Sequence, residues 1–192
     1  MANRRAKIGF RHFEAGNRHF GRGEFAEAAA HYGRALAKDP DNPALMSWLG
    51  ASLCNLSDNA RGLALLRRAA ELSGADGNRW WNYASFAFFA GEFDTARAAM
   101  LRAIELLPGR IRPLYNYVNM VRPTPDDPVV GRIRALMEEG RLDRTGLSYA
   151  HYALATAHEA AREHLVAFDH AVAGGRAYGV ECNLDADNVA RI

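Results

Sequence analysis

The feature that most constrains the fold is an internal period of 34 residues. When the sequence is shifted by one period and then by two, small residues fall on small residues: Gly16 on Gly50 and Ala84, Ala28 on Gly62 and Ala96, and Ala35 on Ala69 and Ala103. Small side chains at fixed positions let two antiparallel helices approach closely. The period therefore predicts a series of packed helix pairs.

Turn and cap residues fall between the expected helices. The turns within the pairs carry Gly23-Glu24-Phe25, Ser57-Asp58-Asn59 and Gly91-Glu92-Phe93. Between the first two pairs, Asn42 can cap a helix and Pro43 can occupy its first position, where a missing N–H costs nothing. These signals predict helix pairs at 8–21 and 24–38, at 42–55 and 59–72, and at 78–90 and 93–107, after a frayed basic lead-in at 1–7.

Over residues 9–109 the sequence resembles tetratricopeptide-repeat (TPR) proteins, whose unit is a helix pair of about 34 residues. The resemblance implies an all-α, right-handed α-α superhelix with repeats at about 9–42, 43–76 and 77–110. We expect one solenoid domain over 1–192.

The repeat becomes irregular after residue 110. A degenerate first helix is expected at 111–122, but Pro123, Pro125 and Pro128 interrupt its partner. A short helix is predicted at 128–139 behind an Asp127 cap, followed by a divergent helix pair at 145–174 that Gly174-Gly175 should end. The tail at 176–192 has weak periodicity, with a last cap expected at 185–188.

Part of this C-terminal third resembles a second family. The stretch from Pro125 to Pro128, the short helix after it, and the segments 148–155 and 166–170 are similar to the region that joins repeats to the catalytic domain in bacterial TPR-containing sulfotransferases. That family's phosphate-cradling loop has no counterpart in this sequence, so no catalytic residue carries over. The resemblance implies the non-catalytic part, or a relic, of such an enzyme.

Composition and charge exclude several functions. A net charge of +2 gives no strong field for nucleic acid. Cys54 and Cys182 lack the spacing of a zinc site or a disulfide framework. No signal peptide and no run of about 18 apolar residues is present, so we expect a cytoplasmic protein without a membrane span.

No motif indicates catalysis, a cofactor or a metal. His158-Glu159 with His164 superficially resembles a metalloprotease helix, but the two histidines are six residues apart, across an expected turn. His12 and His19 share a helix face without a third ligand. We interpret these histidines as surface or inter-helix residues and Cys54 as a packing residue. The enzyme, cofactor and metal predictions are therefore negative.

The concave face is the predicted site. In the TPR family the first helix of each repeat lines an inner groove. Here this places aromatic and amide side chains together: Phe13, Asn17, Phe20, Trp81, Ser85, Phe88, Tyr115, Asn119, Arg122 and Tyr152. Exposed apolar patches are typical of binding sites, and amide side chains can hold a peptide backbone.

The predicted partner is a protein or an extended peptide. The carboxylate clamp that TPR proteins use for Hsp70/Hsp90-type chaperone tails is matched only by Asn17, because its other positions hold Phe13, Trp48, Asn78 and Asn82. Two alternatives stay open: a groove filled by the chain's own ends, and RNA binding through the arginines. A homodimer also stays open.

Overall fold

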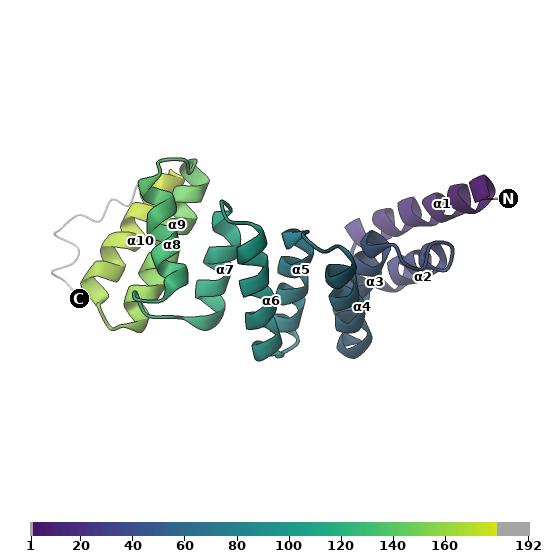
Figure 1. Ribbon diagram of the computed structural model, residues 1–192, viewed down its shortest axis with the longest axis horizontal. Coiled ribbons are helices and arrows are strands. Elements are labelled where there is room, and N and C mark those ends of the chain that lie inside the picture. Colours follow the sequence, from purple (N-terminus) through teal and green to yellow (C-terminus); the bar gives the residue numbers. More distant parts are fainter. Residues whose placement is uncertain (1, 180–192) are drawn as a thin grey trace. The chain divides into compact units, whose positions relative to one another are not determined.

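The computed structural model describes residues 2–179, and their contacts divide the chain into two compact units, Met1–Leu107 and Pro108–Ile192. The described residues form ten α-helices and no strand (Figure 1). The predicted all-α class of stacked helix pairs is confirmed. Two expectations, for Cys182 and for a cap at 185–188, lie outside the described residues.

The first unit consists of three helix pairs. Each first helix packs against the helix that follows it, and the second helix of one pair packs against the first helix of the next. The pairs are α1 (Ala2–Gly21) with α2 (Phe25–Leu36), α3 (Pro43–Asn55) with α4 (Asn59–Leu72), and α5 (Gly77–Phe89) with α6 (Phe93–Leu106).

The recurring small residues lie where the paired helices touch. A Cβ atom at Gly16 would lie 2.6 Å from the Tyr32 ring, and one at Gly50 would lie 2.8 Å from the Gly62 carbonyl oxygen. In the third pair, Ala84 and Ala96 are fully buried. The 34-residue period therefore reflects helix-to-helix distances too short for a larger side chain.

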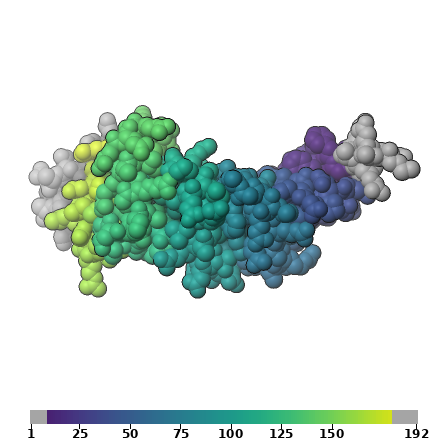
Figure 2. Space-filling view, in the orientation of Figure 1, coloured from purple at the N-terminus to yellow at the C-terminus, as the bar shows by residue number. Residues whose placement is uncertain are grey.

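Tyr32 anchors the core beside the first of these contacts. Its side chain is fully buried and contacts the Phe13 and Trp48 rings, whose centroids are 6.1 and 6.0 Å away. Its hydroxyl donates a hydrogen bond of 2.8 Å to Asn17 Oδ1, and burial raises its pKa to about 12. In the space-filling view of Figure 2, side chains cover the spaces between the helices of the first unit, which is the blue and teal part of the surface.

The helix start at α3 follows the predicted chemistry. Asn42 Oδ1 accepts hydrogen bonds from the backbone N–H groups of Ala44 and Leu45, and Pro43 occupies the first turn. Glu92 precedes α6 without any side-chain cap hydrogen bond.

We expect Asn42→Ala to lower the free energy of unfolding by about 1 kcal/mol, because two N–H groups at the start of α3 lose their acceptor. Glu92→Ala is the matched control, with an expected change within about 0.5 kcal/mol. Urea unfolding followed by circular dichroism measures both. Equal effects would contradict the capping role of Asn42.

The second unit contains α7 (Ile111–Val121), α8 (Pro128–Glu138), α9 (Arg144–Ala160) and α10 (His164–Tyr178). Helices α9 and α10 form a packed pair, and α7 packs against α9, with α8 in contact with both α7 and α9. The Asp127 carboxylate caps α8 by accepting from the Val129 N–H at 2.8 Å, as predicted.

Two predicted boundaries are wrong. Helix α1 begins at Ala2 instead of Ile8, because the alanine, arginine and lysine residues of the basic lead-in are good helix formers. Helix α10 runs through the predicted stop at Gly174-Gly175 to Tyr178. A Cβ at Gly174 would lie 3.3 Å from the Tyr152 ring, so this glycine permits close packing against α9.

Candidate functional site

The first unit has a pocket of about 590 Å³, called here the first-unit pocket. Its walls come from α1, α3 and α5, the first helices of the three pairs, which is the face that the sequence predicts. The lining residues are Phe20, Ser47, Trp48, Ala51, Asp76, Asn78, Arg79, Trp81, Asn82, Ser85 and Phe86.

Aromatic side chains give the first-unit pocket an apolar surface. Phe20 and Trp48 meet edge to face with ring centroids 5.2 Å apart, and Phe25 meets Phe20 edge to face at the same distance. Trp48 remains 38% exposed, and Trp81 is half-buried on the neighbouring helix. Exposed tryptophan beside half-buried aromatic rings is the composition of a binding hot spot.

Amide and hydroxyl groups lie among these rings. The Ser47 and Ser85 hydroxyls each donate to a carbonyl of their own helix, at 2.9 and 3.0 Å, and the Ser47 oxygen also accepts a hydrogen bond from Arg79. Within the described part of the chain the Asn82 side chain has no hydrogen-bond partner. A side-chain amide has both a donor and an acceptor, which suits a peptide backbone.

The charges of the first-unit pocket cancel. Arg79 Nε lies 3.1 Å from Asp76 Oδ2, and Arg79 Nη1 donates to Ser47 Oγ and to the Pro43 carbonyl at 3.0 and 3.2 Å. The guanidinium group therefore joins α5 to α3 and is balanced by a carboxylate. An uncharged ligand segment fits this lining better than an acidic one.

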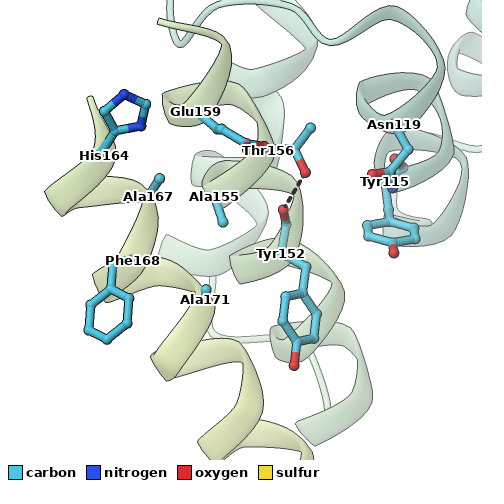
Figure 3. A pocket seen from close by; sticks show the side chains of 10 residues that line it. All are labelled: Tyr115, Asn119, Tyr152, Ala155, Thr156, Glu159, His164, Ala167, Phe168 and Ala171. Carbon is cyan, nitrogen blue, oxygen red and sulfur yellow. Dashed lines mark hydrogen bonds between the residues drawn. The ribbon is translucent and has the colours of Figure 1, made fainter. Parts of the chain in front are cut away.

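The second unit has its own pocket of about 560 Å³, the second-unit pocket, between α7, α9 and α10 (Figure 3). It is lined by Tyr115, Asn119, Tyr152, Ala155, Thr156, Glu159, His164, Ala167, Phe168 and Ala171. Tyrosine and phenylalanine rings again accompany polar groups.

Several polar groups of the second-unit pocket are already engaged. Thr156 Oγ1 donates to the Tyr152 carbonyl at 3.0 Å, the dashed line of Figure 3, and Asn119 Nδ2 donates to the Tyr115 carbonyl at 3.0 Å. Glu159 Oε2 accepts a 2.6 Å hydrogen bond from Arg122 Nη2. This pocket offers a ligand fewer uncommitted amide groups than the first-unit pocket does.

The ten predicted groove residues do not all line one pocket. Three line the first-unit pocket and three line the second-unit pocket: Phe20, Trp81 and Ser85, then Tyr115, Asn119 and Tyr152. Arg122 pairs with Glu159 at the second pocket. The others lie outside the lining of both pockets: Phe13 and Asn17 contact Tyr32, and Phe88 packs against Phe89 and Phe93.

The groove prediction omitted Trp48, Asn82 and Phe86, which line the first-unit pocket. Asn82 and Phe86 each lie one residue after a predicted groove residue, namely Trp81 and Ser85. Adjacent residues on a helix are about 100° apart, so a wide groove reaches both. Widening each predicted helix face by one residue would have found them.

Other chemistry has little support among the described residues. Burial, and then the Asp58 carboxylate, raise the pKa of the Cys54 thiol to about 11, so it stays protonated and poorly nucleophilic. In the described part of the chain no group of three or more histidine, cysteine, aspartate or glutamate residues is arranged to hold a metal ion. No described helix has the length and apolar character needed to cross a bilayer.

Comparisons with known proteins agree with the architecture. Residues 16–56 match the model of the TPR repeat family. No curated protein sequence matches the chain. The fold is similar to that of MamA from Desulfovibrio magneticus RS-1, at 18% identity and a TM-score of 0.67, over 95% of this chain and 98% of that one.

Two further solved structures have peptide-binding descriptions. YrrB, a TPR protein with an unusual peptide-binding site, matches at 13% identity and a TM-score of 0.62, over 86% of this chain and 84% of that one. The first TPR of Spaghetti (RPAP3), bound to the HSP90 peptide SRMEEVD, matches at 20% identity and a TM-score of 0.55, over 60% of this chain and 91% of that one. At these identities the likeness shows a shared TPR fold.

Proposed function

We propose that this protein is a non-enzymatic scaffold that binds an extended segment of a partner protein in the first-unit pocket. The observation that carries the proposal is the juxtaposition of exposed Trp48, half-buried Trp81 and the unpartnered Asn82 amide in one pocket formed by three first helices. The peptide-binding descriptions of YrrB and of the RPAP3 repeat support the same class of ligand.

The proposed ligand is an uncharged, extended peptide with aromatic or aliphatic anchors. The two tryptophans offer area for an apolar side chain, and Asn82 can both donate to and accept from the peptide backbone. Because Asp76 balances Arg79 at 3.1 Å, a terminal carboxylate would meet no uncompensated cation there. We therefore do not expect an acidic chaperone tail of the kind seen with RPAP3 to bind.

The test uses peptides selected from a random linear phage-displayed library on the wild-type chain. We expect Trp81→Ala to weaken the selected peptide by about 2 kcal/mol, or roughly 30-fold, because it removes the central anchor. Isothermal titration calorimetry measures the affinity. Phe89→Ala is the matched control, since that ring is on the same helix, 83% exposed and outside the pocket lining.

Three outcomes would count against the proposal. If selection yields no binding peptide, peptide recognition is refuted. If Phe89→Ala weakens binding as much as Trp81→Ala, the pocket is not the site. If only Phe168→Ala weakens it, the second-unit pocket holds the peptide instead.

A further inference from the structure

Six of the seven histidines form two clusters that have the same composition and spacing. The α1–α2 cluster contains His12, His19, Glu24 and His31, and the α9–α10 cluster contains His151, His158, Glu163 and His170. Each residue of the second cluster lies 139 positions after its counterpart. The same set of three histidines and one glutamate therefore recurs in two helix pairs.

The two clusters also share their contacts. The Nδ1 atoms of His12 and His31 are 3.1 Å apart, and so are those of His151 and His170. The remaining histidine of each cluster stacks on one ring of this pair: His19 on His31 at 5.3 Å between centroids, and His158 on His170 at 5.4 Å. In both clusters the glutamate carboxylate lies 2.5 Å from Nδ1 of this stacked histidine, His19 or His158.

The contact between two Nδ1 atoms depends on protonation. It needs one N–H donor and one nitrogen lone pair, because two imidazolium rings would both be donors. The contact therefore survives the first proton that a pair such as His12 and His31 takes up, and not the second. The carboxylate contact differs, since His19 can donate its Nδ1–H to Glu24 whether its ring is neutral or charged. Acid therefore breaks the contact between the two Nδ1 atoms and leaves the contact with the glutamate.

The surroundings of the first pair disfavour added charge. Burial is the main cause that lowers the pKa of His31, followed by His12, His19, Arg34 and Arg18. Helix α3, which packs against α2, has no aspartate, glutamate, lysine, arginine or histidine. The carboxylate of the cluster, Glu24, contacts His19 and not the His12–His31 pair.

The second pair has a similar environment. Burial lowers the pKa of His151, and burial together with His151, His158 and Arg134 of α8 lowers that of His170, with Asp169 acting in the opposite direction. Arg122, which directly follows α7, reaches α9 but is paired with Glu159. Around His31 two arginines, Arg34 and Arg18, face a single glutamate, Glu24, whereas around His170 Arg134 is opposed by Asp169 and burial is the main cause that disfavours a second proton.

The sign of the pH effect follows. A histidine whose pKa is lower in the folded chain than its usual 6.5 binds fewer protons there than in the unfolded chain. Stability from that neutral ring is fully present above pH ~6.5 and is lost as the pH falls toward the folded pKa. Three such rings, His31, His151 and His170, lie in the two clusters.

We propose that the two histidine clusters are acid-sensitive locks, which hold α1 to α2 and α9 to α10 at neutral pH and release each pair in a mildly acidic medium. Release would also disrupt the pockets, because α1 contributes Phe20 to the first-unit pocket and α9 and α10 line the second-unit pocket. The chain thereby links pH to the availability of its binding surfaces.

Hydrogen exchange measured by mass spectrometry on the full chain tests the proposal at about pH 7.5 and about pH 5.5, corrected for the intrinsic pH dependence of exchange. Helices α3 to α6 contain no histidine and serve as the internal reference. We expect protection of α1–α2 and α9–α10 to fall about tenfold or more relative to that reference, because the stability that the neutral rings contribute at about pH 7.5 is lost in acid. Equal loss everywhere would overturn the proposal.

Matched variants locate the effect. Asparagine can keep a hydrogen-bonding group near the Nδ1 position without titrating. His31→Asn should abolish the acid response of α1–α2 and leave that of α9–α10, and His170→Asn should do the reverse. His164→Asn, outside both clusters, should retain both responses. Because the readout is the ratio between two pH values, a variant that is merely less stable remains informative.

A metal ion is the alternative that the same experiment excludes or reveals. Exchange is repeated with EDTA and with added zinc chloride, and we expect no change at either pH. Protection that requires zinc, or an acid response that persists in His31→Asn and His170→Asn, would contradict the locks.

Discussion

Replacing Tyr32 with alanine is expected to lower the free energy of unfolding of the first unit by about 3–5 kcal/mol. The side chain is fully buried, contacts the Phe13 and Trp48 rings and lies directly over Gly16. Its removal leaves a cavity that three helices border. Because Trp48 also lines the first-unit pocket, the loss extends to the site.

Urea unfolding followed by tryptophan fluorescence measures this effect. Tyr32→Phe is the control, because it keeps the ring and removes only the hydroxyl that donates to Asn17, at an expected cost of about 1 kcal/mol. If Tyr32→Ala cost no more than Tyr32→Phe, the packed ring would not be what holds α1, α2 and α3 together.

Gly50→Leu is expected to destabilise the first unit by about 3 kcal/mol. Even the first added atom would lie 2.8 Å from the Gly62 carbonyl oxygen and 2.9 Å from Leu66 Cγ. The carbonyl belongs to the backbone, so α3 and α4 must separate to make room. Overpacking of this kind outweighs the gain of under 1 kcal/mol in helix propensity that replacing a glycine brings.

The matched control is Gly33→Leu on α2, where an added Cβ atom would meet nothing within 4 Å. We expect that variant to be more stable by about 0.5–1 kcal/mol, since only propensity changes. Thermal unfolding by circular dichroism distinguishes the two. Comparable stability of the two leucine variants would mean that helix approach at Gly50 does not limit the fold.

Much of the fold can be predicted because one residue per helix encodes each close contact. Gly16 and Gly50 lie one repeat period apart on first helices, Gly62 holds the small-residue position of a second helix, and at all three a Cβ atom cannot fit. The same residue type misled the prediction at Gly174, which reads as a helix stop when only its own helix is considered. Its role depends on Tyr152 of another helix, and a local pattern does not contain that information.

The candidate site was predictable in kind but less so in its residues. Trp81 follows from its repeat position, whereas Asn82 depends on the width of the pocket around it. The histidine clusters were missed because only histidines close together in the sequence were compared. His12 and His31 are 19 residues apart on two different helices, and only packing brings their Nδ1 atoms together. The sulfotransferase resemblance, the cytoplasmic location and a homodimer stay predictions.

Peptide binding in the first-unit pocket is tested most directly by a hydrogen-exchange footprint of the wild-type chain with and without the selected library peptide. We predict added protection in α1, α3 and α5, centred on the segments that contain Trp48 and Trp81, with α4 and α6 unchanged. Protection confined to α4 and α6, or to the second unit, would contradict binding at this pocket.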